Sequence, residues 1–182
     1  MNIEIVSGSG RTDSVTFRLA LHLQKALKEK TKHNVNILDV REARFPDLEE
    51  GVFSSVERTP DALKPVAERM FSADAFIIVT PEYNGSYTPM LKNLFDHFPK
   101  QVHKPFGIVS GSPGGLGGVR ACLALQLLIL ALFGIPSPYM LVTPQVNQKF
   151  AEDGTLLDAS FQNAIDNFIA EFLWLAEKVK TN

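Results

Sequence analysis

The stretch AFIIVTPEYNGSYTPMLKNLF, residues 75–95, contains the change of pattern that decides the fold class. Its first six residues, 75–80, are apolar up to the final threonine and rich in β-branched side chains. Such a run is typical of a parallel strand that is covered on both faces. A helical pattern follows at 88–98, where Pro89 is tolerated because it falls in the first turn. The stretch therefore predicts one strand–loop–helix unit of an α/β protein.

The same alternation continues toward both ends of the chain. Period and composition predict further strands at 2–7, 34–40, 105–110 and 137–143, further helices at 14–30, 60–71, 117–133 and 156–179, and a loop at 41–59. Five strands alternating with five helices indicate a parallel sheet with helices on both faces, in one domain spanning residues 1–182. Ligands of such sheets bind beyond the carboxyl ends of the strands, which here selects the loops after Val6, Val79 and Val109.

Composition narrows the class of protein. The 182 residues are 45% hydrophobic, carry a net charge of −2 and include one cysteine, Cys122. Basic and acidic residues are interspersed, which disfavours a nucleic-acid partner, and no apolar run reaches the ~20 residues that a membrane helix needs. His22, His33, His97 and His103 lack the spacing of metal ligands, so no metal site is expected. A cytoplasmic protein without a membrane or nucleic-acid partner is the simplest expectation.

The first selected loop, SGSGRTDS at residues 7–14, is rich in hydroxyls and contains Arg11. Arginine pairs well with phosphate, and the start of the following helix offers main-chain amides to an anion. The alternative is an ordinary turn in which Asp13 or Ser14 only caps the helix. The loop matches neither the nucleoside-triphosphate loop nor the dinucleotide glycine fingerprint, so a compact monophosphate is the favoured ligand. Asp13 weighs against this assignment unless it faces solvent.

The other two loops add rigid turns and glycine. In PEYNGSY, residues 81–87, Pro81 fixes its own φ and Gly85 permits a reversal, so a rigid backbone could read the edge of a flat heteroaromatic ring. A core role for Tyr83 with a plain Asn84-Gly85 turn is the alternative. SGSPGGLGGVRA, residues 110–121, has five glycines between 111 and 118, which would let a ligand approach the main chain closely. Together the three loops favour a cofactor site.

The segments GSGRTDS, PEYNGSYTPMLKNLFD and SGSPGGLGGVRA resemble, in order and spacing, the three signatures of the NADPH-dependent FMN reductase family. The resemblance implies a flavodoxin-like fold, a five-stranded parallel sheet of order 2-1-3-4-5, with FMN as cofactor and NADPH or NADH as hydride donor. It implies a homodimer or homotetramer, with Lys92 and Asp96 near the subunit contact. The implied activity is ping-pong hydride transfer through the flavin to a small acceptor, such as a flavin, quinone, azo compound or metal oxyanion, without a catalytic side chain.

The cofactor-binding residues expected from the loops and the resemblance fall into three groups. The phosphate group is Ser9, Arg11, Thr12, Ser14, Val15 and Thr16. The group beside the flavin ring is Pro81, Glu82, Tyr83, Asn84 and Gly85, with Glu82 acting through its main chain. The group near the flavin and nicotinamide is Ser110, Gly111, Gly114, Gly115 and Gly118.

Two other functions use the same fold. A flavodoxin-type electron carrier would bind FMN without oxidising a pyridine nucleotide, but such carriers are strongly acidic and this chain is nearly neutral. A phosphate-ester hydrolase would need a nucleophile in the first loop, where only Asp13 is available.

Overall fold

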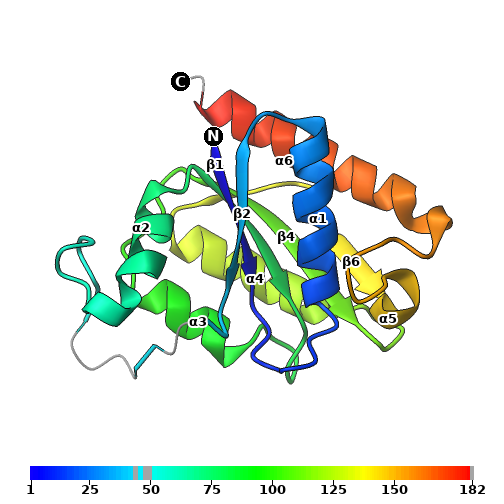
Figure 1. Ribbon diagram of the computed structural model, residues 1–182, viewed down its shortest axis with the longest axis horizontal. Coiled ribbons are helices and arrows are strands. Elements are labelled where there is room, and N and C mark those ends of the chain that lie inside the picture. Colours follow the sequence, from blue (N-terminus) through cyan, green and yellow to red (C-terminus); the bar gives the residue numbers. More distant parts are fainter. Residues whose placement is uncertain (43–44, 47–50, 181–182) are drawn as a thin grey trace.

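The computed structural model describes residues 1–42, 45–46 and 51–180. A central sheet runs through the molecule with helices on both sides (Figure 1). Its strands are β1 (Asn2–Ser7), β2 (Asn34–Asp39), β3 (Ala75–Thr80), β4 (Pro105–Ser112), β5 (Ile135–Pro136) and β6 (Leu141–Pro144). Its α-helices are α1 (Phe17–Lys30), α2 (Lys64–Ser72), α3 (Pro89–Asp96), α4 (Val119–Ala131), α5 (Val146–Lys149) and α6 (Gln162–Lys180). Short 3-10 turns η1 (Asp61–Leu63) and η2 (Ala159–Phe161) lead into α2 and α6.

All strand pairs are parallel, in the order β2-β1-β3-β4-β5, with β6 also paired to β4. This order confirms the predicted 2-1-3-4-5 sheet. Parallel neighbours place their carboxyl ends at one edge, so the loops after β1, β3 and β4 begin at that edge. The loops after β1 and β3 lie side by side at the lower edge in Figure 1.

The predicted fifth strand, 137–143, is wrong in its bounds. β5 pairs with Pro105 and Phe106, and the Ser137 amide still donates to the carbonyl oxygen of Phe106 at 2.7 Å. Residues 138–140 then leave the ladder, and β6 pairs with Val109 to Ser112. The interruption has a chemical cause, because Pro138 has no N–H to donate to a neighbouring strand. The fifth position of the sheet is therefore an edge built from two short segments.

The helix bounds also differ from the prediction. The pattern gives no sign of α5, and the long helix expected at 156–179 begins only at Gln162, after η2. The first helix begins at Phe17 instead of residue 14, which leaves a longer loop after β1. Of the loop predicted at 41–59, residues 43–44 and 47–50 lie outside the described part of the chain.

Two hydrophobic cores lie on opposite faces of the sheet. Along β3, Phe76 and Ile78 join the core beneath α2, α3 and α4, while Ile77 and Val79 join the core beneath α1 and α6. This alternation is the period-2 geometry of a strand whose two faces are both covered. The sheet is therefore enclosed on both sides, which leaves its edges as the parts that are not covered by a core.

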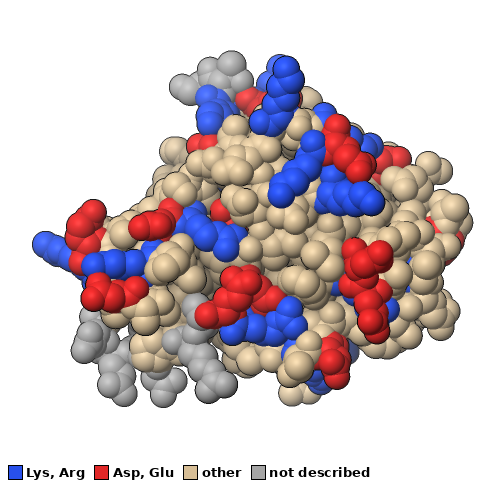
Figure 2. Space-filling model, in the orientation of Figure 1, with Lys and Arg blue, Asp and Glu red and all other residues tan. Residues whose placement is uncertain are grey.

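Charge is spread over the molecule. On the face shown in Figure 2, Lys and Arg lie among Asp and Glu without a large patch of one sign. In the described residues, no helix combines the length and apolar character needed to cross a membrane.

Candidate functional site

A cavity of about 220 Å³ opens at the carboxyl edge of the sheet. The loops after β1, β3 and β4 all contribute to its walls, which joins segments about a hundred residues apart in the sequence. Its lining residues are Ser9, Arg11, Asp13, Ser14, Val15, Thr16, Pro81, Glu82, Tyr83, Gly111, Ser112 and Pro113.

The loop after β1 offers free main-chain donors. Among the described residues, the amides of Thr12, Asp13, Val15 and Thr16 have no hydrogen-bond acceptor. The Ser14 hydroxyl organises the end of the loop, because it lies 3.1 Å from the Thr16 hydroxyl and accepts the Phe17 amide at 3.3 Å. Unpaired amides next to the start of a helix form a binding site for an anion.

Arg11 is exposed and borders the cavity. Its guanidinium lies over the ring of Tyr83, 5.1 Å from the centroid, and pairs with no carboxylate in the described part of the chain. The cation–π contact brings the loops after β1 and β3 together. Asp13, the residue that weighed against a phosphate, is also exposed at the rim.

The loop after β3 is a tight two-residue turn. Tyr83 and Ser86 exchange main-chain hydrogen bonds of 2.8 and 3.0 Å. Asn84 and Gly85 between them both have positive φ, 50° and 85°, which is the pattern of a type I′ turn. Thr88 then caps α3 by accepting the Leu91 amide at 3.2 Å and donates to the carbonyl oxygen of Gly8. The turn is thus fixed both internally and to the loop after β1.

An ion pair joins the loop after β3 to α4. The Glu82 carboxylate accepts two hydrogen bonds from Arg120, one from the main-chain amide at 3.1 Å and one from the side-chain Nε at 2.6 Å. Because Gly118, the N-cap residue of α4, has no side chain to cap the helix, Glu82 supplies the capping acceptor from another loop. This carboxylate is engaged in holding the two loops together, so its main chain is the part of Glu82 that remains for a ligand.

Ser110 and Cys122 support the glycine-rich loop from below. The buried Ser110 hydroxyl donates to the carbonyl oxygen of Gly117 at 2.8 Å, and the Cys122 thiol donates to that hydroxyl at 3.1 Å. Burial raises the pKa of Cys122 to about 11, so the thiol stays protonated at neutral pH.

Cys122 is therefore expected to be inert in the folded protein. At about pH 8, a chromogenic disulfide reagent should modify it at least ~100-fold more slowly than in the urea-unfolded chain, where the pKa of the thiol is ordinary and the sulfur is accessible. The measurement is the reaction rate with and without urea. Fast modification of the folded chain would contradict both the burial and the hydrogen bond.

Nine of the sixteen expected cofactor-binding residues line the cavity: Ser9, Arg11, Ser14, Val15, Thr16, Pro81, Glu82, Tyr83 and Gly111. Asn84 and Gly85 form the adjoining turn, Ser110 lies beneath the loop after β4, and Gly114, Gly115 and Gly118 belong to that loop. Thr12 lines neighbouring cavities instead. Asp13, Ser112 and Pro113 line the cavity although the sequence does not select them, and their place inside the selected loops was the available signal.

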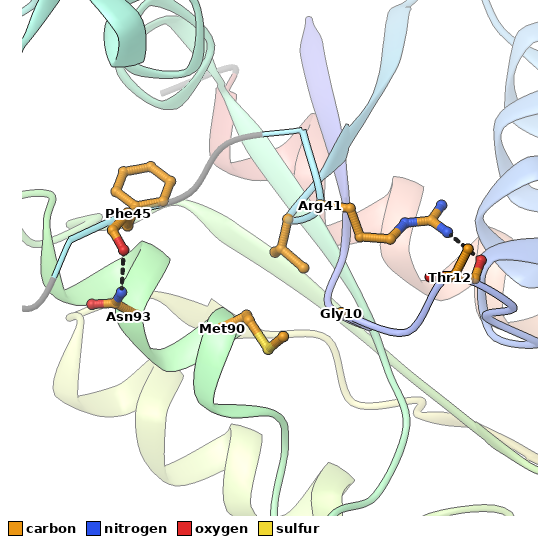
Figure 3. A pocket seen from close by; sticks show the side chains of 7 residues that line it. Gly10, Thr12, Arg41, Phe45, Met90 and Asn93 are labelled. Carbon is orange, nitrogen blue, oxygen red and sulfur yellow. Dashed lines mark hydrogen bonds between the residues drawn. The ribbon is translucent and has the colours of Figure 1, made fainter.

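A larger cavity of about 610 Å³ lies on the other side of the loop after β1. It is lined by Gly10, Thr12, Val40, Arg41, Phe45, Met90 and Asn93 (Figure 3). The Asn93 amide donates to the carbonyl oxygens of Phe45 and Pro46, which connects α3 to the chain that follows β2. The loop after β1 thus forms a wall shared by two cavities.

Lys92 and Asp96 form an ion pair within α3. Their spacing of four residues places them on one side of the helix, as expected of a simple intrahelical pair. Their predicted role near a subunit contact stays a prediction.

The parallel sheet of order β2-β1-β3-β4-β5, with helices on both faces and a cavity where three loops meet at its carboxyl edge, is a flavodoxin-like fold. The model of the NADPH-dependent FMN reductase family matches residues 1–148, and the chain belongs to that family. It is therefore an NAD(P)H-dependent oxidoreductase of the flavoprotein class, with FMN as cofactor and NADPH as electron donor.

Individual known proteins resemble this chain in sequence and in structure. An FMN-dependent NADPH-azoreductase from Staphylococcus aureus is 31% identical over 165 residues, covering 87% of this chain and 86% of that protein. The flavoenzyme NAD(P)H:(acceptor) oxidoreductase FerB from Paracoccus denitrificans superposes with a TM-score of 0.77 at 24% identity, covering 97% of both chains. A cysteine-to-alanine mutant of flavodoxin from Pseudomonas aeruginosa superposes with a TM-score of 0.57 at 19% identity, covering 94% of this chain and 99% of that one. The two structures support the fold.

The residues present fit FMN. Free amides and an unpaired arginine suit a phosphate at the loop after β1. At Gly115 a Cβ atom would meet nothing within 4 Å, so the glycine-rich loop leaves open space where a flat ring could approach the main chain.

Proposed function

We propose that residues 1–182 form a single FMN-binding domain that oxidises NADPH or NADH and reduces a small acceptor. The observation that carries the residue assignment is the set of free amides at Thr12, Asp13, Val15 and Thr16 beside the unpaired Arg11. These groups would hold the phosphate. The residues of the other two loops, from Pro81 to Gly85 and from Ser110 to Gly118, would hold the ring. A cytoplasmic location is part of the proposal.

The chemistry that FMN supplies when bound is ping-pong hydride transfer, from NAD(P)H onto the flavin and then to a small acceptor. The acceptor would be a flavin, a quinone, an azo compound or a metal oxyanion, because an open stacking site accepts many flat or small oxidants. The S. aureus relative supports an azo compound as one member of this set. The chain's own contribution is positional: fixed turns and main-chain donors orient two stacked partners and stabilise negative charge on the ring.

Anaerobic mixing with NADPH tests the proposed activity. The visible absorbance of the bound flavin should disappear on mixing and return when a quinone or an azo dye is added. A flavodoxin-type carrier would keep its absorbance in NADPH. Steady-state rates at several fixed acceptor concentrations test the sequence of steps, because ping-pong exchange gives parallel double-reciprocal lines and a ternary complex gives intersecting ones.

A homodimer or homotetramer is the second part of the proposal, and α4 supports it. Leu123, Leu127 and Leu130 recur at helical spacing and are exposed, with Phe133 just beyond the helix. An exposed apolar stripe of this kind marks an interaction surface. A second copy is the occupant we propose, because the described α4 carries one charged residue, Arg120, which is already paired with Glu82.

Leu127→Asp is expected to shift the protein to monomers by raising the dissociation constant at least ~100-fold, because a carboxylate would be buried at the contact. Leu127 is the most exposed residue of the stripe, at 72%. Sedimentation velocity across a concentration series measures the change. Leu157→Asp, at an exposed leucine away from α4, is the control and should leave the association unchanged. Equal behaviour of the two variants would remove α4 from the proposal.

A further inference from the structure

The sheet register brings the end of β2 next to the loop after β1. Ser7, the last residue of β1, is paired with Asp39, the last residue of β2, and the Val40 amide donates to the carbonyl oxygen of Ser7 at 3.1 Å. Arg41 therefore leaves the sheet beside the loop that contains the free amides. This position makes a contact between Arg41 and that loop possible.

Asp39 holds the Arg41 side chain in one orientation. Nε of Arg41 donates to both carboxylate oxygens of Asp39, at 3.0 Å to Oδ1 and 2.9 Å to Oδ2. Nη2 of Arg41 donates to Oδ2 at 2.5 Å, so two nitrogens of the guanidinium bind the same carboxylate. The Asp39 side chain is only 5% exposed, and the guanidinium also lies over the Phe17 ring, 4.8 Å from the centroid. The charge of Arg41 is thus neutralised, and its direction is fixed.

The remaining nitrogen of the guanidinium reaches the loop after β1. Nη1 of Arg41 donates to the carbonyl oxygen of Thr12 at 2.9 Å and to that of Arg11 at 3.3 Å. Figure 3 shows the side chain extended across to Thr12.

These two bonds determine where the neighbouring amides point. In a trans peptide the N–H of one residue is directed opposite to the carbonyl of the residue before it. Since the carbonyls of Arg11 and Thr12 face Arg41, the amides of Thr12 and Asp13 face away from it. Arg41 lines the larger cavity, and it lines another one together with Asp13 and Ser14, but it does not line the smaller cavity that Arg11 borders. The guanidinium therefore contacts the loop from outside the candidate phosphate site.

We propose that Arg41, clamped by Asp39, is a positioning residue that presets the loop after β1 for the phosphate of the flavin. It turns two carbonyl oxygens away from the anion and leaves two amides free to donate to it. The inference rests on the proposed binding of FMN. Arg41 acts through the shape of the loop, because its own charge is neutralised by Asp39.

Comparing FMN with riboflavin isolates this role, because riboflavin lacks the phosphate. In Arg41→Gln the dissociation constant of FMN should rise about tenfold, the loss of a charge-assisted contact, whereas that of riboflavin should change by less than about twofold. Quenching of flavin fluorescence measures both constants. The dissociation constant of FMN for Arg41→Lys should lie between those of the parent and of the glutamine variant. Lysine keeps the positive charge but lacks the planar guanidinium that can donate to Asp39 and to the loop at the same time.

Arg69→Gln is the matched control. Arg69 pairs with the buried Glu4 on β1, at 3.1 Å from Nε and 2.5 Å from Nη2. The exposed fractions of its side chain and its partner's, 28% and 3%, nearly equal those of Arg41 and Asp39, 29% and 5%. Arg69→Gln should cost comparable stability and leave the ratio of the two flavin affinities unchanged.

Two results would overturn the inference. Equal weakening of FMN and riboflavin in Arg41→Gln would show general damage, and parent-like dissociation constants for both flavins would show no role for Arg41. In either case the ratio of the two flavin affinities stays at the value of the parent. If Arg41→Gln does not fold, the same ratio is measured on Arg41→Lys, and a parent-like value there has the same meaning. A parent protein that binds neither flavin would instead remove the proposed function itself, a result distinct from the other two.

Discussion

Arg11→Ala is expected to weaken FMN binding by about 100-fold, since hydrogen bonds between a guanidinium and a phosphate contribute about 2–3 kcal/mol. The fold should be unaffected, because Arg11 is exposed, its side chain contacts the ring of Tyr83, and its main-chain hydrogen bonds are kept in alanine. Titration of the variant with FMN, followed by flavin fluorescence, measures the change, and circular dichroism checks the fold.

Two comparisons sharpen this test. Arg58→Ala makes the same chemical change at another exposed position, outside the three loops, and should bind FMN as the parent does. Riboflavin should bind Arg11→Ala nearly as well as it binds the parent, because the lost contact is to the phosphate. Unchanged retention of FMN by Arg11→Ala would remove the phosphate from this loop.

Gly117→Ala is expected to lower the free energy of unfolding by about 2–4 kcal/mol, from a left-handed backbone penalty added to overpacking. Gly117 has a φ of +62°, and a Cβ atom there would lie 2.7 Å from the main-chain nitrogen of Pro144. It would also lie 2.9 Å from the carbonyl carbon of Thr143. Because both atoms belong to the backbone of β6, the strand itself would have to move.

Gly115→Ala provides the comparison within the same loop. Nothing lies within 4 Å of a Cβ atom at Gly115, so its effect should stay within about 0.5 kcal/mol. Urea unfolding of both variants and the parent, all freed of flavin, gives the three free energies, because bound flavin would add its own stabilisation. Similar values for the two variants would mean that the loop can rearrange away from β6.

The sequence predicts the sheet well where side-chain pattern alone determines structure. The apolar residues of β3 alternate between two cores, and their lack of polar interruption follows from burial on both faces. The prediction fails at the sheet edge, where Pro138 interrupts pairing and only two short segments contact β4. Edge pairing depends on which main-chain donors are available, and an apolar pattern does not report that.

The candidate site is likewise only partly predictable from the sequence. Three loops can be selected because the fold places them together, and glycine, hydroxyl and arginine content marks them. Composition does not show which side of the loop each residue faces. The sequence therefore predicts that Thr12 lines the smaller cavity, but Thr12 lines the larger one and Asp13 lines the smaller. The contact of Arg41 with the loop depends on the register of β1 and β2 and joins residues 29 positions apart, so no local pattern signals it.

The first residues of β1 and the last described turn of α6 lie at the sheet edge opposite the loops. The Asp74 carboxylate joins them, because it accepts the Asn2 amide at 2.7 Å and the Lys180 ammonium at 2.9 Å. Both ends lie at the top of Figure 1, and the eight residues of β4 alone span roughly 26 Å. Coupling the protein to an electrode or bead through the α6 end would therefore leave the carboxyl edge of the sheet turned outward, open to dissolved small molecules.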